Sequence, residues 1–444
     1  MGMMIKPHLV QRILIGFGIT FIGLTWLSLN GPSARGTEQR AFEIDRQSLE
    51  EQKPSQDQTL WHDLANTQNK TLGFGKIFVI NLPSRTDKRD NISLGSSVTG
   101  LTVDFVDGVD PETVNPKTYP YNWNYDQSDT EYACRRAHVN VAQRIVAEGL
   151  DSAIIFEDDI DWDFGIKAQV QSLALATRAL QGTPSNFTGS PYGHDWDVLW
   201  TGHCGMECKN EEPFFMTPND MTVVMARHLP HYFFGVPDYD VSNRTRLTCT
   251  LRDAACTTSY GLSYRGAQKV LAALSVNPSG FADQVDTSVQ IDVALGRMCL
   301  TGVLRCFGAF PSLTGRYVSA GLASKGTDQR KPDEIPQMKP AFSDGVIYST
   351  MLNIKRILRG QRTVEATWSD VELHTILPED IHIDGGECHP PIHPSKAAAT
   401  PDLPLPDLNI NLYSSIETGD VPSGTLSPHY EASSSSPVPI PWKR

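Results

Sequence analysis

The segment SAIIFEDDIDWD, residues 152 to 163, places several carboxylates where they could do chemistry. Its apolar run ends at Glu157, Asp158 and Asp159, and Asp161 and Asp163 follow closely. Neighbouring carboxylates repel each other and raise one another's pKa, so a divalent cation is their usual partner. The other interpretation is a polar loop with solvated acids, and this segment by itself leaves both open.

Under the first interpretation, the segment predicts a metal site. Mg²⁺ and Mn²⁺ prefer oxygen ligands and are commonly held by one or two carboxylates together with phosphates. We therefore expect Mn²⁺ or Mg²⁺ at Glu157, Asp158 and Asp159. Because side chains alternate along a strand, Glu157 and Asp159 should share a face. Asp161 and Asp163 are expected to be solvated or to cap the next helix.

Other residues could bind a ligand or serve the structure. Arg85 and Arg89, in PSRTDKRD, could contact a diphosphate through charge-assisted hydrogen bonds or lie in a charged surface loop. His138 follows Cys134 by one helical turn and could equally be a satisfied core histidine. His203 follows a predicted strand among small residues that would let a ligand approach.

An aromatic loop, YPYNWNY, contains Tyr121, Trp123 and Tyr125. Such rings stack well on sugars, but they could simply pack on the core.

Alternating strands and helices must position these residues. Apolar runs predict strands at 76–82, 101–110, 152–158 and 196–202, and helical spacing predicts helices at 131–150, 263–274 and 288–299, with Gly149 ending the first. This order predicts an α/β domain with a mainly parallel sheet. Sites in such folds lie at the carboxyl ends of strands, where Asn81, Asp107, the acidic triplet and His203 fall.

The N-terminus predicts a membrane anchor. Lys6, His8 and Arg12 precede an uncharged apolar stretch at 13–29, which is long enough to span the hydrocarbon core. The basic flank predicts a cytoplasmic tail at 1–12 and a translocated remainder. A cleaved signal peptide is the alternative. Residues 30–71 are polar and predict a flexible stem.

The rest of the chain divides into three parts. We expect a catalytic domain at 72–330, a poorly defined extension at 331–389 and a disordered tail rich in Pro and Ser at 390–444. Four sequons, at Asn69, Asn91, Asn186 and Asn243, agree with translocation. Eight cysteines suggest disulfides, with Cys299–Cys306 the favoured local pair. The net charge of −13, without a basic stripe, argues against nucleic acid as a partner.

Three blocks in this order, KIFVINLPSRTDKRD, YACRRAHVNVAQRIVAEGLDSAIIFEDDIDWD and DVLWTGHCG, resemble glycosyltransferase family 25. That family includes lipopolysaccharide and collagen galactosyltransferases, and we expect this chain to be one of its fungal members. The resemblance spans about residues 72 to 315. It implies a GT-A-like single domain, a UDP-sugar donor, a divalent metal and inversion at the anomeric carbon.

The resemblance also assigns roles. Asn81, Arg85 and Arg89 match a segment near the nucleotide, His138 matches a helix histidine, and the acidic triplet matches the metal motif. We group Asp107 with the nucleotide-binding residues from its place at a strand end. There are two departures: Ala137 replaces a Ser, and Gln290-Ile291 replaces Pro-Val.

An inverting transfer needs a base for the acceptor hydroxyl, and FADQVDTSVQIDVALGRMC offers candidates. Asp292 fits the resemblance best, and its apolar neighbours could raise its pKa toward a useful value. Asp286 is the other candidate, although it could instead cap a helix, and Asp283 looks like a loop acid. Both candidates could also be surface residues, in which case Asp107 or Asp110 comes next.

The predicted function is therefore a metal-dependent hexosyltransferase, with galactose favoured, that acts on a glycan or glycoprotein acceptor. It would be a type II membrane protein of the Golgi or endoplasmic reticulum with a luminal catalytic domain. A metal-dependent phosphoesterase would need more His and Asp at strand ends. A non-catalytic lectin-like or scaffold protein is the remaining alternative, and the intact acidic triplet counts against it.

Overall fold

The structure is a computed structural model that describes residues 60, 63–120, 123–187, 189–229, 244–276, 280–286, 288–326, 328, 337–370 and 373–391. The predicted anchor, most of the predicted stem, Tyr121, the Asn243 sequon and nearly all of the Pro/Ser-rich tail lie outside these residues. Among the helices that the structure describes, none combines the length and the apolar character that crossing a bilayer requires.

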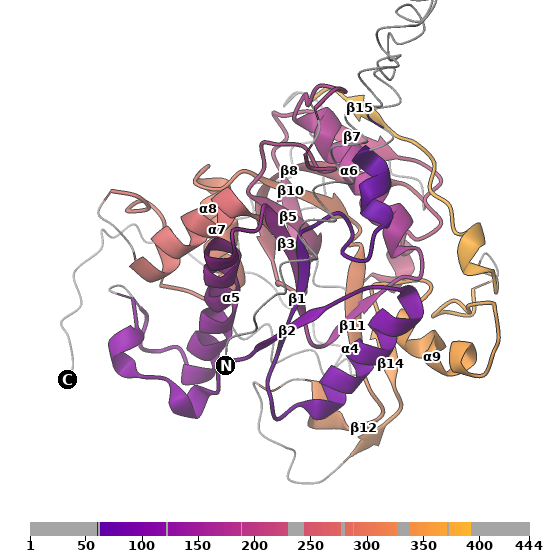
Figure 1. The fold of residues 1–444 in the computed structure, drawn as a ribbon, viewed down its shortest axis with the longest axis horizontal. Helices are drawn as coiled ribbons and strands as arrows, with labels where there is room; N and C mark the ends of the chain where they lie inside the picture. The colour runs from indigo at the N-terminus through magenta and orange to yellow at the C-terminus, as the bar shows by residue number, and fades with distance from the viewer. Residues whose placement is uncertain are drawn as a thin grey trace, which may run out of the picture. The chain divides into compact units, whose positions relative to one another are not determined.

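A ten-stranded sheet forms the centre of the domain (Figure 1). Its order is β15-β7-β8-β10-β5-β9-β3-β1-β2, with β6 beside β8. The strands are β1 (Lys76–Asn81), β2 (Asp104–Asp107), β3 (Ser152–Glu157), β5 (Val198–Gly202), β6 (Gly205–Cys208), β7 (Phe214–Thr217), β8 (Arg246–Ala255), β9 (Ser259–Ser263), β10 (Cys306–Phe310) and β15 (Glu387–His389).

Most strands of this sheet point the same way. β1 pairs in parallel with β2 and β3, β5 pairs in parallel with β10, and the other pairings are antiparallel. Traced through these pairings, only β8, β9 and β15 oppose the common direction of the sheet. The α/β prediction is therefore confirmed. The sequence patterns missed β9, which runs antiparallel between β3 and β5.

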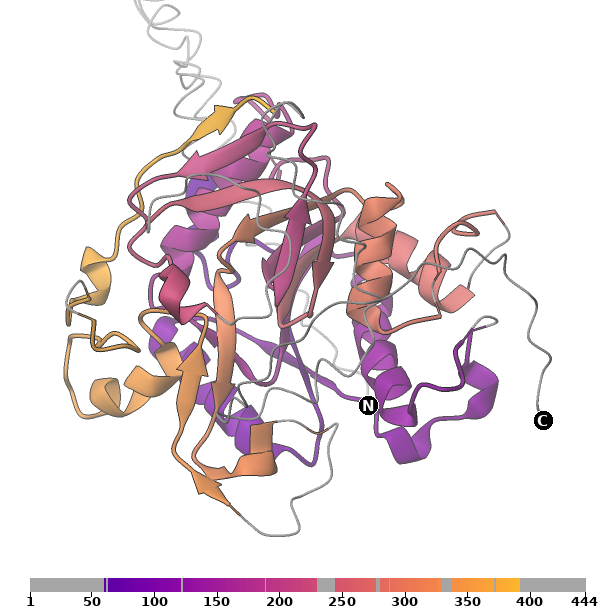
Figure 2. The same ribbon diagram turned by 180° about the vertical axis from the view of Figure 1, so that it is seen from behind.

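Helices lie on both sides of the sheet (Figure 2). They are α4 (Thr86–Thr99), α5 (Asp129–Glu148), α6 (Ile166–Leu180), α7 (Tyr264–Leu271), α8 (Ile291–Leu300) and α9 (Thr350–Leu358). Shorter helices are η1 (Asn66–Gln68), η2 (Pro111–Thr113), η3 (Pro116–Thr118), η4 (Ala226–His228), η5 (Ala272–Val276), η6 (Ala323–Gly326) and η7 (Pro378–Asp380). Figures 1 and 2 show α5, α7 and α8 on one side of β1 and β3, with α4 and α9 on the other.

Helix α5 shows how local sequence sets the bounds of an element. Ser128 and Glu131 form a capping box at its start, and Gly149 ends it with a left-handed backbone at φ 65°. The predicted stop at Gly149 is confirmed. Ala137, Val141 and other apolar residues at helical spacing are buried against the domain, as predicted.

The core begins before the predicted domain boundary at residue 72. Leu64 lies in the segment predicted to be stem, yet it is fully buried in the main hydrophobic cluster together with Leu72 and Trp162. The nearby Asp63 pairs with Arg178 of α6 at 3.5 Å. This short stretch carries no periodic pattern, so its contribution to the core was not visible in the sequence.

The expected extension at 331–389 is built into the domain. β14 (Phe342–Asp344) pairs with β11 (Thr314–Val318), which pairs with β4 (Ile160–Trp162), and β15 extends the central sheet at β7. The remaining two strands, β12 (Gly321–Leu322) and β13 (Met338–Lys339), pair with each other. The described residues from 337 to 391 thus belong to the same compact unit as the rest of the domain.

Two buried aspartates hold this extension in place. Asp161 accepts hydrogen bonds from the Ser343 and Ser349 hydroxyls, and Asp163 accepts from the Tyr348 and Gly165 backbone amides. Burial raises the pKa of Asp161 to about 6 and that of Asp163 to about 7. The prediction that these acids are solvated was wrong, because partners from distant segments replace water. Neither acid is the N-cap of α6, which is Gly165, although Asp163 accepts from the Gly165 amide just before that helix.

Three disulfides link cysteines of the described residues. Cys299–Cys306 forms as predicted, and Cys204–Cys256 and Cys208–Cys249 tie β8 and its following turn to the region around β6. The other two cysteines, Cys134 and Cys388, are free thiols.

Candidate active site

A cleft of about 190 Å³ opens at the carboxyl ends of β1 and β3. The chain leaves β1 through α4 to reach β2 on one side, and then returns through α5 to β3 on the other side. Such a reversal of strand order leaves a crevice where ligands bind in open α/β sheets. The charged or titratable lining residues are Lys88, Cys134, His138, Glu157, Asp158, Asp159 and Asp328.

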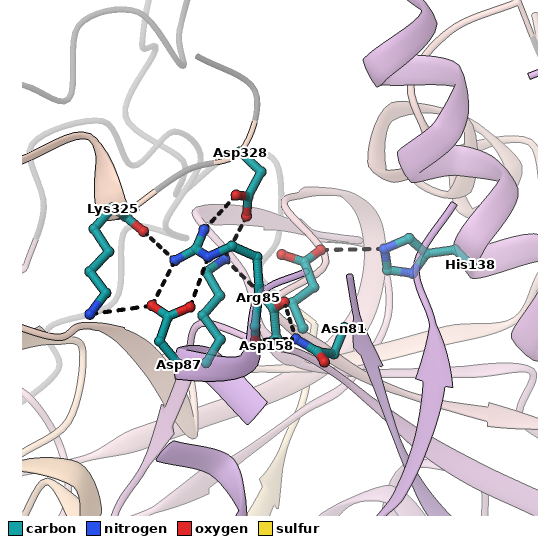
Figure 3. Close-up of polar contacts among 9 residues, drawn as sticks. Asn81, Arg85, Asp87, His138, Asp158, Lys325 and Asp328 are labelled. Carbon is teal, nitrogen blue, oxygen red and sulfur yellow. Dashed lines mark hydrogen bonds and ion pairs between the residues drawn. The ribbon is translucent and has the colours of Figure 1, made fainter. Parts of the chain in front are cut away.

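Asp158 is held by two partners in the cleft (Figure 3). Its Oδ1 lies 2.6 Å from the Lys88 Nζ, and its Oδ2 accepts a hydrogen bond from the Asn81 Nδ2 at 2.9 Å. Lys88 is buried, and the nearby carboxylates Asp158, Asp159 and Asp328 raise its pKa although desolvation opposes this. Asp158 therefore acts in this structure as the counter-ion of a buried lysine.

Glu157 is bound on the opposite side of the cleft. Its Oε1 accepts a hydrogen bond from the Thr257 hydroxyl at 2.7 Å and lies 3.4 Å from the His138 Nε2. Burial by itself would raise the pKa of Glu157, but His138 and Thr257 bring it below its ordinary value. The other nitrogen of His138 lies 3.1 Å from the Tyr260 hydroxyl, so the imidazole orients Glu157. His138 is both buried and part of the cleft wall.

Asp159 differs from its two neighbours. Within the described residues, no hydrogen bond or ion pair reaches its carboxylate, which lines the cleft. Burial raises its pKa to about 6; Lys88 lowers it, while Glu157 and Asp158 raise it further. A buried carboxylate with two carboxylate neighbours is stabilised in its ionised form by a nearby cation.

A network of charges borders the cleft at the start of α4. Arg85 bonds to Asp87 and Asp328, and its Nη2 donates to the Lys325 carbonyl at 2.8 Å. Lys325 also pairs with Asp87 at 3.3 Å, and the Lys88 Nζ lies 3.2 Å from Asp328. Figure 3 shows these side chains converging on the cleft from two segments that are distant in sequence.

Of the five predicted nucleotide-binding residues, His138 lines the cleft, Asn81 and Arg85 contact residues that line it, and the other two lie apart from it. Arg89 stacks on Phe105 of β2, with its guanidinium carbon 4.2 Å from the ring centroid. Asp107 ends β2 as predicted, but its side chain is exposed. The neighbouring Gly108 and Val109 reach the cleft instead.

The two base candidates also lie outside the cleft lining. Asp292 is buried in the first turn of α8, where its Oδ2 accepts a hydrogen bond from the Cys256 backbone amide at 3.0 Å. Burial raises its pKa, as its apolar neighbours predicted. Asp286 is half exposed and pairs with Arg297 at 2.5 Å. Asp286 does not cap α8, whose N-cap residue is Gln290.

The remaining acids of these segments have local roles. Asp283 accepts a hydrogen bond from the Gly280 amide, as expected of an acid in a loop. Asp110 caps η2 by accepting a hydrogen bond from the Glu112 amide.

His203 and most of the aromatic side chains of the YPYNWNY loop have structural surroundings. His203 is buried, with its Nε2 2.9 Å from the Ala309 carbonyl, and burial lowers its pKa to about 4. Trp123 is buried beside Tyr132 of α5, whereas Tyr125 is 63% exposed. Trp123 therefore packs on the core, whereas the exposed Tyr125 ring meets the Tyr119 ring edge-on, with centroids 5.7 Å apart.

The acidic triplet does not form a three-ligand metal cage. In the described part of the chain, no three His, Cys, Asp or Glu side chains are grouped so as to hold a metal ion. Mg²⁺ and Mn²⁺ do not need such a cage, because one or two carboxylates plus phosphates and water are enough. Asp159, with its carboxylate unpaired toward the cleft, fits this smaller requirement. Whether it binds a metal stays a prediction.

Sequence reasoning missed Lys88, Thr257 and Asp328. Lys88 follows Arg85, the N-cap residue of α4, by three residues. Residues three apart lie on the same face of a helix, so this spacing could have identified Lys88. No local signal points to Thr257 or Asp328, which reach the cleft from 100 and 170 residues beyond Glu157 and Asp158.

The comparison with known proteins bears on residues that surround this cleft. Residues 74–183 match the family model described as glycosyltransferase family 25 (LPS biosynthesis protein). These residues are therefore similar to glycosyltransferase family 25. The family 25 segment runs from β1 to α6 and contains Asn81, Lys88, His138 and the acidic triplet.

The chain is also similar to individual proteins. Procollagen galactosyltransferase 1 of Danio rerio is 24% identical over 233 residues, which cover 50% of this chain and 32% of the relative. Procollagen galactosyltransferase 2 of Mus musculus is 23% identical over 215 residues, covering 46% of this chain and 28% of the relative. A Bos taurus protein named "Probable inactive glycosyltransferase 25 family member 3" is 24% identical over 215 residues, covering 46% and 29%.

The chain thus spans about a third of the length of the curated relatives it matches. These three are animal proteins, so the fungal origin expected from the sequence stays a prediction.

Proposed function

We propose that this protein is a glycosyltransferase that moves a hexose, with galactose the first candidate, from a UDP-sugar to a glycan or glycoprotein acceptor with inversion. The observation that carries this proposal is the cleft at the β1/β3 switch point, in which Asp159, without a hydrogen-bond or ion-pair partner among the described residues, lies near Arg85 and Lys88. The family 25 match supports the reaction class, and the names of the galactosyltransferase relatives favour galactose.

The cleft suits a nucleoside diphosphate. One wall includes the apolar residues Val109, Pro111 and Ala133, against which the planar nucleobase could pack. Another wall includes the charged Lys88. Charge-assisted hydrogen bonds from lysine and arginine are strong phosphate contacts. We place the base against the apolar wall and the diphosphate near Lys88 and Arg85.

A divalent metal, Mn²⁺ or Mg²⁺, would be held by Asp159 together with the donor phosphates. When bound, it would supply Lewis-acid stabilisation to the leaving diphosphate. His138 and Thr257 would hold Glu157 in its ionised form, which adds negative charge close to that cation.

For the base we retain Asp292 ahead of Asp286. Its raised pKa suits proton transfer, and its helix lies on the α5 side of the sheet. Its hydrogen bond to the Cys256 amide also allows a positioning role, because Thr257 is the next residue and contacts Glu157. The kinetics of Asp292→Asn and Asp286→Asn would separate the two roles.

We also propose a luminal location behind an N-terminal membrane anchor. The three disulfides favour an oxidising compartment, and the sequon residues Asn69 and Asn186 are exposed on the domain. Treatment with a glycosidase should increase the gel mobility of protein from a secretory host. An unshifted protein that carbonate releases from membranes would contradict this location.

The experiment for the proposed activity uses the detergent-solubilised full chain. UDP-galactose, UDP-glucose and UDP-N-acetylglucosamine are supplied in turn, with Mn²⁺ or with a chelator, and with glycoprotein and collagen-peptide acceptors. We expect UDP release from one donor that requires Mn²⁺ and rises with acceptor. Absence of metal-dependent turnover with every donor would contradict the proposal.

A non-catalytic sugar-binding protein is the second candidate. It is favoured by the bovine relative named as probably inactive and by the pairing of Asp158 with Lys88, which occupies one acid of the triplet. It predicts that a UDP-sugar binds without turnover in the same assay.

A further inference from the structure

We propose that the carboxylate of Asp328 occupies the place of a donor phosphate, and that a nucleoside diphosphate binds by displacing it from Arg85 and Lys88. This inference rests on the proposed function, because it names the residues that receive the diphosphate.

The two oxygens of Asp328 bridge two cations. Oδ1 lies 2.5 Å from the Arg85 Nη1, and Oδ2 lies 3.2 Å from the Lys88 Nζ. A phosphate group binds cationic side chains in the same way, with separate oxygens on separate nitrogens. The arrangement in Figure 3 is therefore that of an anion subsite occupied by an anion from the same chain.

The cations are fixed and the anion is peripheral. Lys88 is buried, and Asp158 holds it at 2.6 Å without help from Asp328. Arg85 is likewise fixed by Asp87 and by the Lys325 carbonyl. The side chain of Asp328 is 30% exposed, compared with 10% for both Lys88 and Asp158. Displacement would therefore leave both cations in position.

The charge balance changes when Asp328 leaves. Arg85, Lys88 and Lys325 carry three positive charges, whereas Asp87, Asp158 and Asp328 carry three negative charges and Asp159 adds a fourth that acts on Lys88. Displacement of Asp328 therefore removes the excess negative charge, and a cation bound at Asp159 would make the site net positive. Arg85 and Lys88 also lie in and next to the first turn of α4, where the helix dipole favours negative charge.

The test measures binding, not sugar transfer. UDP and inorganic pyrophosphate are titrated into the full chain by calorimetry, with Mn²⁺ and with a chelator. Asp328→Asn removes the competing charge, so we expect it to bind both ligands about three to ten times more tightly. Asp90→Asn is the matched control, because Asp90 is an exposed acid on the same helix and its loss changes the net charge equally. We expect no gain from it.

The variant Lys88→Gln tests the contact between Lys88 and the phosphate. It should weaken the binding of UDP and of pyrophosphate at least tenfold. Because Lys88 loss leaves Asp158 buried without its partner, Lys88→Gln with Asp158→Asn is prepared as well, and thermal unfolding shows which variant is folded. The gain from Asp328→Asn should disappear when it is combined with the folded Lys88 variant.

The outcomes separate this inference from the proposed function. Tighter binding in Asp328→Asn without sugar transfer by any form would uphold the anion subsite and reject the transferase. Transfer by the wild-type chain with unchanged or weaker binding in Asp328→Asn would overturn the inference and leave the transferase standing. Equal gains in Asp328→Asn and Asp90→Asn would also overturn it, because they would reflect net charge only.

Discussion

Three adjacent acids, Glu157, Asp158 and Asp159, have three different environments at one strand end. Glu157 is held ionised by His138 and Thr257, Asp158 neutralises Lys88, and Asp159 lacks a partner within the described residues. The uncompensated carboxylate is the one that gains most from a bound cation. Substitution of Asp159 should therefore have the largest effect on metal binding among the three acids.

Asp159→Asn should abolish metal-dependent transfer and leave the fold intact. Because burial raises the pKa of Asp159 to about 6, its ionised form destabilises the metal-free fold above that pH. The variant should thus be more stable than wild type by about 1–2 kcal/mol at pH 7.5, with the advantage lost below about pH 4. Initial rates and urea unfolding measure both effects. Near-normal turnover of the variant with Mn²⁺ would show that the site is misassigned.

Metal affinity should depend on pH through the same group. A metal ligand must be deprotonated, so protons compete with Mn²⁺ below the pKa of about 6. We expect the apparent affinity to fall about tenfold per pH unit below pH 6 and to be constant above about pH 7. Calorimetric titration between pH 5 and 8 would show this, and a flat profile would exclude Asp159 as the ligand.

Asp292→Asn and Asp286→Asn separate the base candidates. The true base should lose at least about a hundredfold in kcat while binding of UDP and Mn²⁺ is retained. A pH–rate profile that loses its acidic limb in Asp292→Asn would assign proton transfer to Asp292. If Asp292 instead positions Thr257, Asp292→Asn should change KM as well as kcat, and the acidic limb of the pH–rate profile should remain. Normal turnover by both variants would move the search to Asp107.

At the scale of elements, the C-terminal segment is part of the catalytic domain because of polar contacts. Ser349 caps α9 by accepting from the Leu352 amide, and its hydroxyl also donates to the buried Asp161. One side chain thus starts a helix and satisfies an acid located two residues after the acidic triplet.

Ser349→Ala should therefore lower the free energy of unfolding by about 1–3 kcal/mol, which combines a lost cap with a lost hydrogen bond to a buried acid. Ser93→Ala is the control, because Ser93 is exposed and its hydroxyl donates to the Arg89 carbonyl of its own helix. Urea unfolding measures both variants. Equal effects would mean that the contact between Asp161 and Ser349 contributes nothing to stability.

At the scale of the whole molecule, the domain extends beyond both predicted boundaries. Leu64 is fully buried in the main core, and Asp63 pairs with Arg178. A fragment that begins at residue 72 would leave a hole in the core in place of Leu64.

A fragment of residues 60–391 should therefore be more stable than one of residues 72–391 by about 2–5 kcal/mol, the usual result of removing a buried leucine. Urea unfolding of both fragments tests this, with Leu64→Ala in the longer fragment as the matched comparison. Identical midpoints for the two fragments would show that residues 60–71 do not stabilise the domain.

Local sequence determined the elements that carry the site. The apolar run of β3 and the helical spacing and glycine stop of α5 act over a few residues, so they could be predicted, as could the place of Asn81 and Glu157 to Asp159 at strand ends. The local pairing of Cys299 with Cys306 belongs to the same class, since only a short loop separates them.

The tertiary structure decided what each charged group does. Lys88 meets Asp158 across 70 residues of sequence, and Arg85 meets Asp328 across 243. The burial of Asp161 and Asp163 depends on serines and amides from residues 343–351. A carboxylate in the sequence is equally compatible with water, a metal or a lysine. Only the folded arrangement determines which of these lies within hydrogen-bond distance, because ionic and hydrogen-bond energies depend on separation in space and on burial.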